Sequence, residues 1–132
     1  MTTFCTPVKP GELENVSDED KDLMKLVLNK GAEKIKELEG QPEVEASIRN
    51  ILGEAYRSLG FYDEAFLHHE RALALRLELF DPEHLDVATS YNNIGLVHYA
   101  KGQYDKALEY YQKSLAIDLK ELGLDHPHLA TT

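Results

Sequence analysis

The stretch LGEAYRSLGFYDEAFLHHERALAL, from Leu52 to Leu75, carries the main structural signal of this chain of 132 residues. After a shift of 42 residues it aligns, without insertion, with IGLVHYAKGQYDKALEYYQKSLAI, from Ile94 to Ile117. The identities include these pairs: Asn50 and Asn92, Gly53 and Gly95, Gly60 and Gly102, Tyr62 and Tyr104, Asp63 and Asp105, Ala65 and Ala107. Self-similarity at one fixed period indicates a repeat protein.

Each copy of the repeat is predicted to form two antiparallel helices. Apolar residues recur every three or four positions, which favours helices over strands. Gly60 and Gly102 stand where the first helix of each copy must end, because glycine adopts the left-handed conformation that closes a helix. Pro82 then interrupts the chain. The sequence therefore predicts unit 1 over residues 43–81 and unit 2 over residues 84–123.

A further helix is predicted before unit 1. Ser17, followed by three acidic residues, offers a side-chain cap and negative charge at a helix start. We expect one helix over residues 18–39, with Gly31 as a weak point inside it. The predicted organisation adds a flexible lead at 1–16, this N-terminal helical segment at 17–40, and the start of a truncated third unit at 124–132.

Composition narrows the classes of partner and compartment. Fourteen basic against 24 acidic side chains give a formal net charge of −10, which repels nucleic acid and anionic lipid. No apolar run approaches the roughly 20 residues of a membrane-spanning helix, and the first residues do not resemble a secretory signal. We therefore expect a cytoplasmic protein with no nucleic acid or membrane partner. Cys5 is the only cysteine, which leaves no internal disulfide and no thiolate metal site.

The repeated residues resemble the tetratricopeptide repeat family. The positions that carry the resemblance are Leu52, Gly53, Tyr56, Gly60, Tyr62, Ala65 and Ala72, with Ile94, Gly95, Gly102, Tyr104 and Ala107 in unit 2. His98 and Ser114 depart from the pattern. The period of 42 exceeds the usual length of about 34, and the connector LFDPEHLDVATSYNNIG is similar to linkers of the kinesin-light-chain subclass.

This resemblance implies an all-α fold in which helix pairs stack as a right-handed solenoid, and a concave groove that binds a protein or peptide. The groove residues that it implies are Ser47, Asn50, Glu54, Arg57, Thr89, Asn92, Leu96 and Tyr99. An asparagine amide can bond a peptide backbone of any sequence, although Asn50 and Asn92 could instead be surface residues or hold the repeat loops. Arg57 could bind a carboxylate or pair with Glu54. Glu54 also argues against a clamp for the C-terminal carboxylate of chaperones.

Two other functions stay open. The chain ends inside what should be the next first helix, so we expect the last helix to keep an uncovered apolar face, either because the sequence is part of a longer array or because a second copy covers it. The residues of this expected oligomer face are Leu108, Tyr111, Leu115 and Leu119. The chain could also be a sensor or regulatory segment of a larger signalling protein.

The sequence predicts no catalytic, metal or cofactor site. His68 and His69 are adjacent, so on a helix their side chains point about 100° apart and do not readily share an ion. We expect His69 to pack in the core. His126 and His128 could bind a transition metal weakly, but they belong to the repeated connector. Glycine-rich phosphate loops and serine elbows are absent from the sequence, so we expect a scaffold and not an enzyme.

Overall fold

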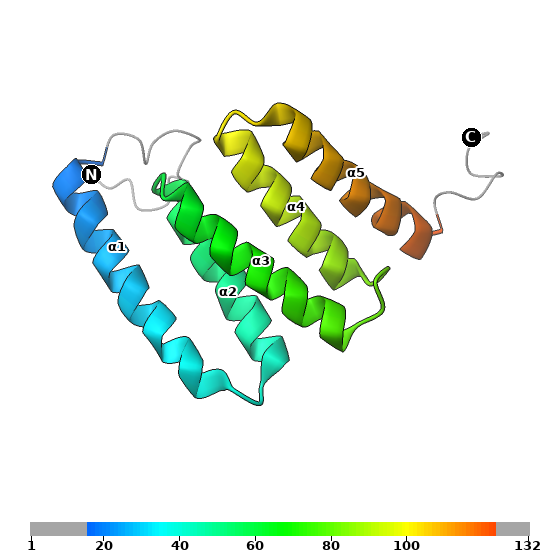
Figure 1. Cartoon of the computed structure of the whole chain (residues 1–132), viewed down its shortest axis with the longest axis horizontal. Coiled ribbons are helices and arrows are strands. Elements are labelled where there is room, and N and C mark those ends of the chain that lie inside the picture. Colours follow the sequence, from blue (N-terminus) through cyan, green and yellow to red (C-terminus); the bar gives the residue numbers. More distant parts are fainter. Residues whose placement is uncertain (1–15, 124–132) are drawn as a thin grey trace, which may run out of the picture.

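A computed structural model describes residues 16–123, in which helices joined by short turns are the only regular secondary structure (Figure 1). In chain order the elements are α1 (Asp18–Glu33), the 3₁₀ helix η2 (Lys34–Leu38), α2 (Pro42–Ser58), α3 (Tyr62–Leu79), α4 (Leu85–Ala100) and α5 (Tyr104–Glu121). The predicted truncated third unit and all of the predicted flexible lead except Val16 lie outside the described residues.

The two predicted units correspond to two helix pairs, α2 with α3 and α4 with α5. Helix α5 begins and ends 42 residues after α3, so the period found in the sequence is the period of the structure. Gly60 and Gly102 close the first helix of each pair with φ of 89° and 79°, which confirms the left-handed conformation predicted for them.

Helix α1 is shorter than predicted. Ser17 caps it as expected, because its hydroxyl oxygen accepts a hydrogen bond from the backbone N–H of Asp20 at 3.2 Å. The α-helix ends at Glu33, however, and the tighter η2 follows. This change of pitch carries Ile35 into the core, where it is 4% exposed. The helical segment therefore ends in a turn that anchors it to unit 1.

The main core lies where η2, α2, α3 and α4 meet. Tyr56 is its largest member, 1% exposed, and it packs in one cluster with Leu52, Ala65 and Val97. Ala65 and its repeat equivalent Ala107 are almost fully buried, and their small side chains let the paired helices approach closely. By contrast, α1 contributes no buried residue, although Leu28 and Ala32 pack against the cluster.

The packing order makes α2 and α4 the inner helices of the stack. Each helix packs against the next along the chain, and α2 also contacts α4. Comparable packing between α3 and α5 is absent from the described residues, so the two second helices stand further apart. In Figure 1, α2 lies behind α3 and the two units follow one another across the view. The stack therefore presents α2 and α4 on one side and α3 and α5 on the other.

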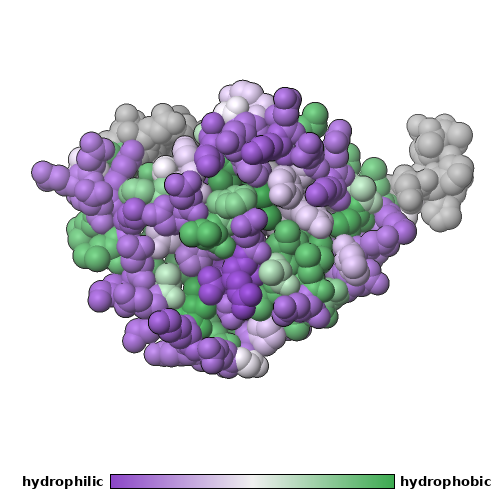
Figure 2. Space-filling model, in the orientation of Figure 1, coloured by the Kyte–Doolittle hydropathy of each residue, from purple (hydrophilic) through white to green (hydrophobic). Residues whose placement is uncertain are grey.

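The outer surface is mixed in character. Figure 2 shows hydrophobic side chains interspersed with hydrophilic ones over the helices, without one continuous apolar patch on this side. None of the described helices is both long and apolar enough to cross a membrane.

Candidate functional site

The inner helices expose a stripe of side chains, which we call the inner face. Exposed positions recur every three or four residues along α2, at Val44, Ser47, Ile51, Glu54 and Ser58. On α4 they are Leu85, Thr89, Asn92 and Tyr99, with the partly buried Leu96 between the last two. Ile51 is 65% exposed and Tyr99 is 58% exposed, although both are large apolar side chains. Apolar side chains that are left in water on a packed helix mark a surface suited to contact.

Most of the predicted groove residues lie on the inner face. Ser47, Glu54, Thr89, Asn92 and Tyr99 are exposed, whereas Arg57 and Leu96 are partly buried. The Thr89 hydroxyl donates a hydrogen bond to the Leu85 carbonyl oxygen at 3.1 Å, so it already has a partner within its own helix. Whether any of these residues binds a partner remains a prediction.

Asn50 departs from that pattern because it is buried, with 8% of its surface exposed. Arg76 can only donate, so the Asn50 amide oxygen faces Arg76 Nη1 at 2.8 Å, and the amide nitrogen donates to His69 Nδ1 at 2.9 Å. Arg76 continues the network by donating to Ser90 Oγ on α4. The Asn50 amide is thus occupied inside the protein by two residues of α3, whereas the sequence suggested a contact with a peptide, a surface position or a role in the repeat loops.

His69 is the ionisable group in the middle of this network. It is fully buried, as predicted, and because its Nδ1 accepts from Asn50, its proton is on Nε2. Burial, and after it the charges of Arg57, His68 and Arg76, lower the pKa of His69 to about 4. His69 is therefore a neutral ring at neutral pH.

The repeated glycines Gly53 and Gly95 each pack against an aromatic ring of the paired helix. A Cβ atom on Gly53 would lie 2.5 Å from His69 Nε2, and one on Gly95 would lie 2.7 Å from Tyr111 Cε1. His69 and Tyr111 occupy the same position in their units. Only glycine leaves room for the ring in each case, which explains why the sequence keeps it in both copies.

Arg57 is a cation without a carboxylate partner in the described part of the chain. Its Nε is buried and has no hydrogen-bond acceptor there, and the expected alternative pairing with Glu54 is not formed. The side chain lies close enough to His69 and to Tyr111 to lower the pKa of both. Burial and Tyr99 act in the opposite direction on Tyr111 and raise its pKa overall. Arg57 therefore lies at the seam between the two units, near His69 of unit 1 and Tyr111 of unit 2.

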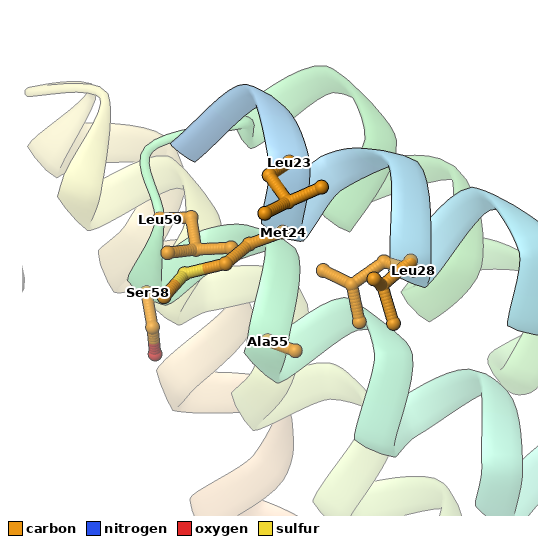
Figure 3. A pocket seen from close by; sticks show the side chains of 7 residues that line it. Leu23, Met24, Leu28, Ala55, Ser58 and Leu59 are labelled. Atoms are coloured by element: carbon orange, nitrogen blue, oxygen red, sulfur yellow. The ribbon is translucent and has the colours of Figure 1, made fainter. Parts of the chain in front are cut away.

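An apolar hollow, which the sequence did not predict, lies at the edge of the inner face. The α1–α2 hollow has a volume of about 450 Å³ and an almost wholly apolar lining of Leu23, Met24, Val27, Leu28, Ala55, Ser58 and Leu59. Figure 3 shows the α1 side chains facing those of α2 across it. Leu23 and Val27 are 61% and 63% exposed. The signal in the sequence was an apolar stripe on α1 that is wider than one contact with α2 requires.

The expected oligomer face of α5 is partly occupied. Leu108 and Leu115 are 54% and 56% exposed, in line with an uncovered face. Tyr111 and Leu119 are partly buried instead. Tyr111 turns inward because its ring packs on Gly95. The exposed apolar surface of α5 therefore centres on Leu108 and Leu115.

The histidines between residues 16 and 123 make contacts that stabilise the fold. The His68 ring stacks on Tyr56 with centroids 5.4 Å apart, and His84 caps α4 by accepting from the Asp86 N–H at 3.0 Å. His98, one of the two departures from the repeat pattern, is buried and bonds Gln103 at 2.8 Å. Between residues 16 and 123, no three metal-binding side chains come together. The His126 and His128 pair lies outside the described residues.

Comparison with known proteins agrees with the repeat architecture. The profile of the tetratricopeptide repeat family matches residues 44–120 and again residues 86–132, so the two matches begin 42 residues apart. Together they span about two thirds of the chain. Comparison with curated proteins gave no match. The 42-residue period, the paired helices and the two glycines that pack against aromatic rings agree with this profile. The chain belongs to the tetratricopeptide repeat family.

Proposed function

We propose that the chain is a scaffold that binds a segment of a partner protein along its inner face. Tetratricopeptide repeats are in general protein-interaction scaffolds and not enzymes. The observation that carries the proposal is the exposure of Ile51 and Tyr99 on the two inner helices, while equally apolar residues of the same helices are buried. Removing such side chains from water on binding contributes about 25 cal/mol for each Å² buried.

The composition of the inner face suits an extended segment. Polar side chains such as Ser47, Glu54 and Asn92 lie between the apolar ones and can bond a peptide backbone. Ser58 belongs both to the inner face and to the α1–α2 hollow, so an apolar side chain of the same ligand can reach that hollow. The partner is therefore a protein segment with alternating apolar and polar contacts.

A peptide-display selection with the full chain tests this proposal. We expect the Ile51→Glu, Tyr99→Glu double variant to lose the peptides that the unmodified chain retains, because it places charge on the apolar positions of the inner face. Leu67→Glu is the matched control, since Leu67 on α3 is 65% exposed, as Ile51 is. If the control lost binding while the double variant kept it, the binding surface would lie on the second helices instead.

Self-association through α5 is the second candidate function. It is supported by the exposure of Leu108 and Leu115, two large apolar side chains of α5 that do not pack in the core. Leu115→Glu should abolish any dimer that sedimentation detects at high concentration, without loss of helicity. Leu119 is a poorer target because it is partly buried, and a charge there would also disturb the helix pair. A strict monomer at all concentrations would remove this candidate.

We also propose the finer assignments that the sequence suggested. The 42-residue period and the connector between the units support a kinesin-light-chain-like subclass. The acidic composition supports an adaptor that does not bind nucleic acid, and a cytoplasmic location is part of the same proposal. A role as the sensor segment of a larger signalling protein would use the same inner face.

A further inference from the structure

We propose that the inner face selects segments carrying an anionic side chain, and that Arg57 is the residue that anchors this group. The inference rests on the proposed function, because it names the chemistry of the ligand for the same surface. It concerns a carboxylate or a phosphate, which share the charge and the acceptor oxygens that a guanidinium recognises.

The first support is the state of the Arg57 guanidinium. Burial of Nε removes water from part of the cation, yet no carboxylate of the described chain lies within ion-pair distance. A partly desolvated charge without a counter-ion is unfavourable. An anionic group of a bound ligand would pair with this charge and lower its free-energy cost. Two other cations of the units are already engaged: Lys101 lies 3.5 Å from Asp63, and Arg49 lies 2.6 Å from Glu45.

The second support is the set of donors around Arg57. The Tyr111 ring packs on Gly95, which lies four residues before Tyr99 on α4, and Arg57 and Tyr99 each affect the pKa of Tyr111. Neither phenolic hydroxyl has a hydrogen-bond partner among residues 16–123. A guanidinium and a neighbouring free phenolic hydroxyl offer several donors to one anionic group, whereas a neutral amide would leave most of them unused.

The charge of the whole chain does not oppose this contact at short range. The net charge of −10 acts over distances that physiological salt screens within about 8 Å. The nearest opposing group on α2 is Glu54, three positions before Arg57 and exposed. Neighbours at that spacing have Cβ atoms about 5–6 Å apart, so Glu54 should weaken the site without abolishing it.

Four pools of short peptides with blocked termini provide the test, with the full chain as the bait. The central residue is Asp, Asn, phosphoserine or serine, and acidic residues are excluded elsewhere. We expect the unmodified chain to retain Asp over Asn, or phosphoserine over serine, by about tenfold or more, as expected for a charge-assisted hydrogen bond. The pair that shows the preference identifies a carboxylate or a phosphate as the ligand group.

Three single variants assign the preference to Arg57. Arg57→Gln should reduce the ratio to near one, and Glu54→Gln should increase it. Arg71→Gln removes the same type of charge from α3, where Arg71 is 52% exposed, and should leave the ratio unchanged. Circular dichroism of each variant checks folding. The Arg57 Nε–H signal in NMR spectra should shift on addition of the preferred pool.

The outcomes separate the inference from the proposed function. Equal retention of charged and neutral pools, with loss of both by the Ile51→Glu, Tyr99→Glu variant, overturns the anion anchor and leaves the inner face as a binding surface. Retention of no pool overturns both. A preference that survives Arg57→Gln also overturns the assignment of Arg57.

Discussion

Unit 1 and unit 2 have the same arrangement of paired helices, but they differ in which side chains are buried. Gly53 and Gly95, which pack against aromatic rings, and the buried Ala65 and Ala107 are the same in both units, and they let the paired helices approach closely. Polar positions differ: Asn50 is buried whereas Asn92 is exposed, and Ile51 is 65% exposed whereas Asn93 is 6% exposed. We attribute the difference to the neighbours, because unit 1 is covered by α4 on one side and only loosely by α1 on the other. A repeat sequence therefore specifies the helix pair, and the stack specifies what each position does.

The largest difference between the units should appear on acidification, since unit 1 has His69 where unit 2 has Tyr111. Above pH 6.5 the ring is neutral in both states of the chain. As the pH falls from 6.5 to about 4, the unfolded chain binds a proton that the folded chain does not, so stability is lost. Below that range both states are protonated and the loss stops. We expect a total loss of about 3 kcal/mol from this group.

Urea unfolding at pH 7.5 and pH 4 measures this loss. His69→Gln keeps an acceptor for Asn50 but does not titrate, so its stability should depend less on pH than that of the unmodified chain. Glu64, whose pKa is lowered chiefly by its hydrogen bond with Lys25, adds the same acid sensitivity to both proteins. An identical pH dependence of the two would show that His69 is not protected from protons.

An intermediate effect should distinguish the two asparagines. Asn50→Ala leaves Arg76 and His69 without their shared partner and should reduce the free energy of unfolding by about 2 kcal/mol. Asn92→Ala removes an exposed amide and should change it by less than about 0.5 kcal/mol. Thermal and urea unfolding of the two variants give the comparison. Equal costs would mean that the network at the junction adds nothing to stability.

The smallest effect should come from Ile51→Asn, which gives unit 1 the residue that unit 2 has at this position. Because the Ile51 side chain is mostly in water, we expect a change in stability within about 0.5 kcal/mol. Urea unfolding measures it. A loss above 1 kcal/mol would imply that Ile51 is covered in solution, for example by α1.

The fold could be predicted because its signals are local. Gly60 and Gly102 end helices whatever surrounds them, and a 42-residue period shows that the same pair is built twice. The candidate site was less accessible to sequence reasoning. The repeat pattern does not reveal that Arg76 reaches Asn50 from α3, because the residue equivalent to Arg76 in unit 2 is Asp118. The α1–α2 hollow and the unpaired state of Arg57 likewise depend on how separate helices meet.

The sparse packing of α1 affects how the protein unfolds locally. Helix α1 buries no residue of its own and is held mainly by the Lys25–Glu64 ion pair, the Tyr56–Asn29 hydrogen bond and a few half-buried apolar contacts. Local opening free energies are lowest where buried apolar contact is sparse. The first turns of α1 can therefore detach while the remaining helices stay folded, which would expose the apolar flank of α2 without global unfolding.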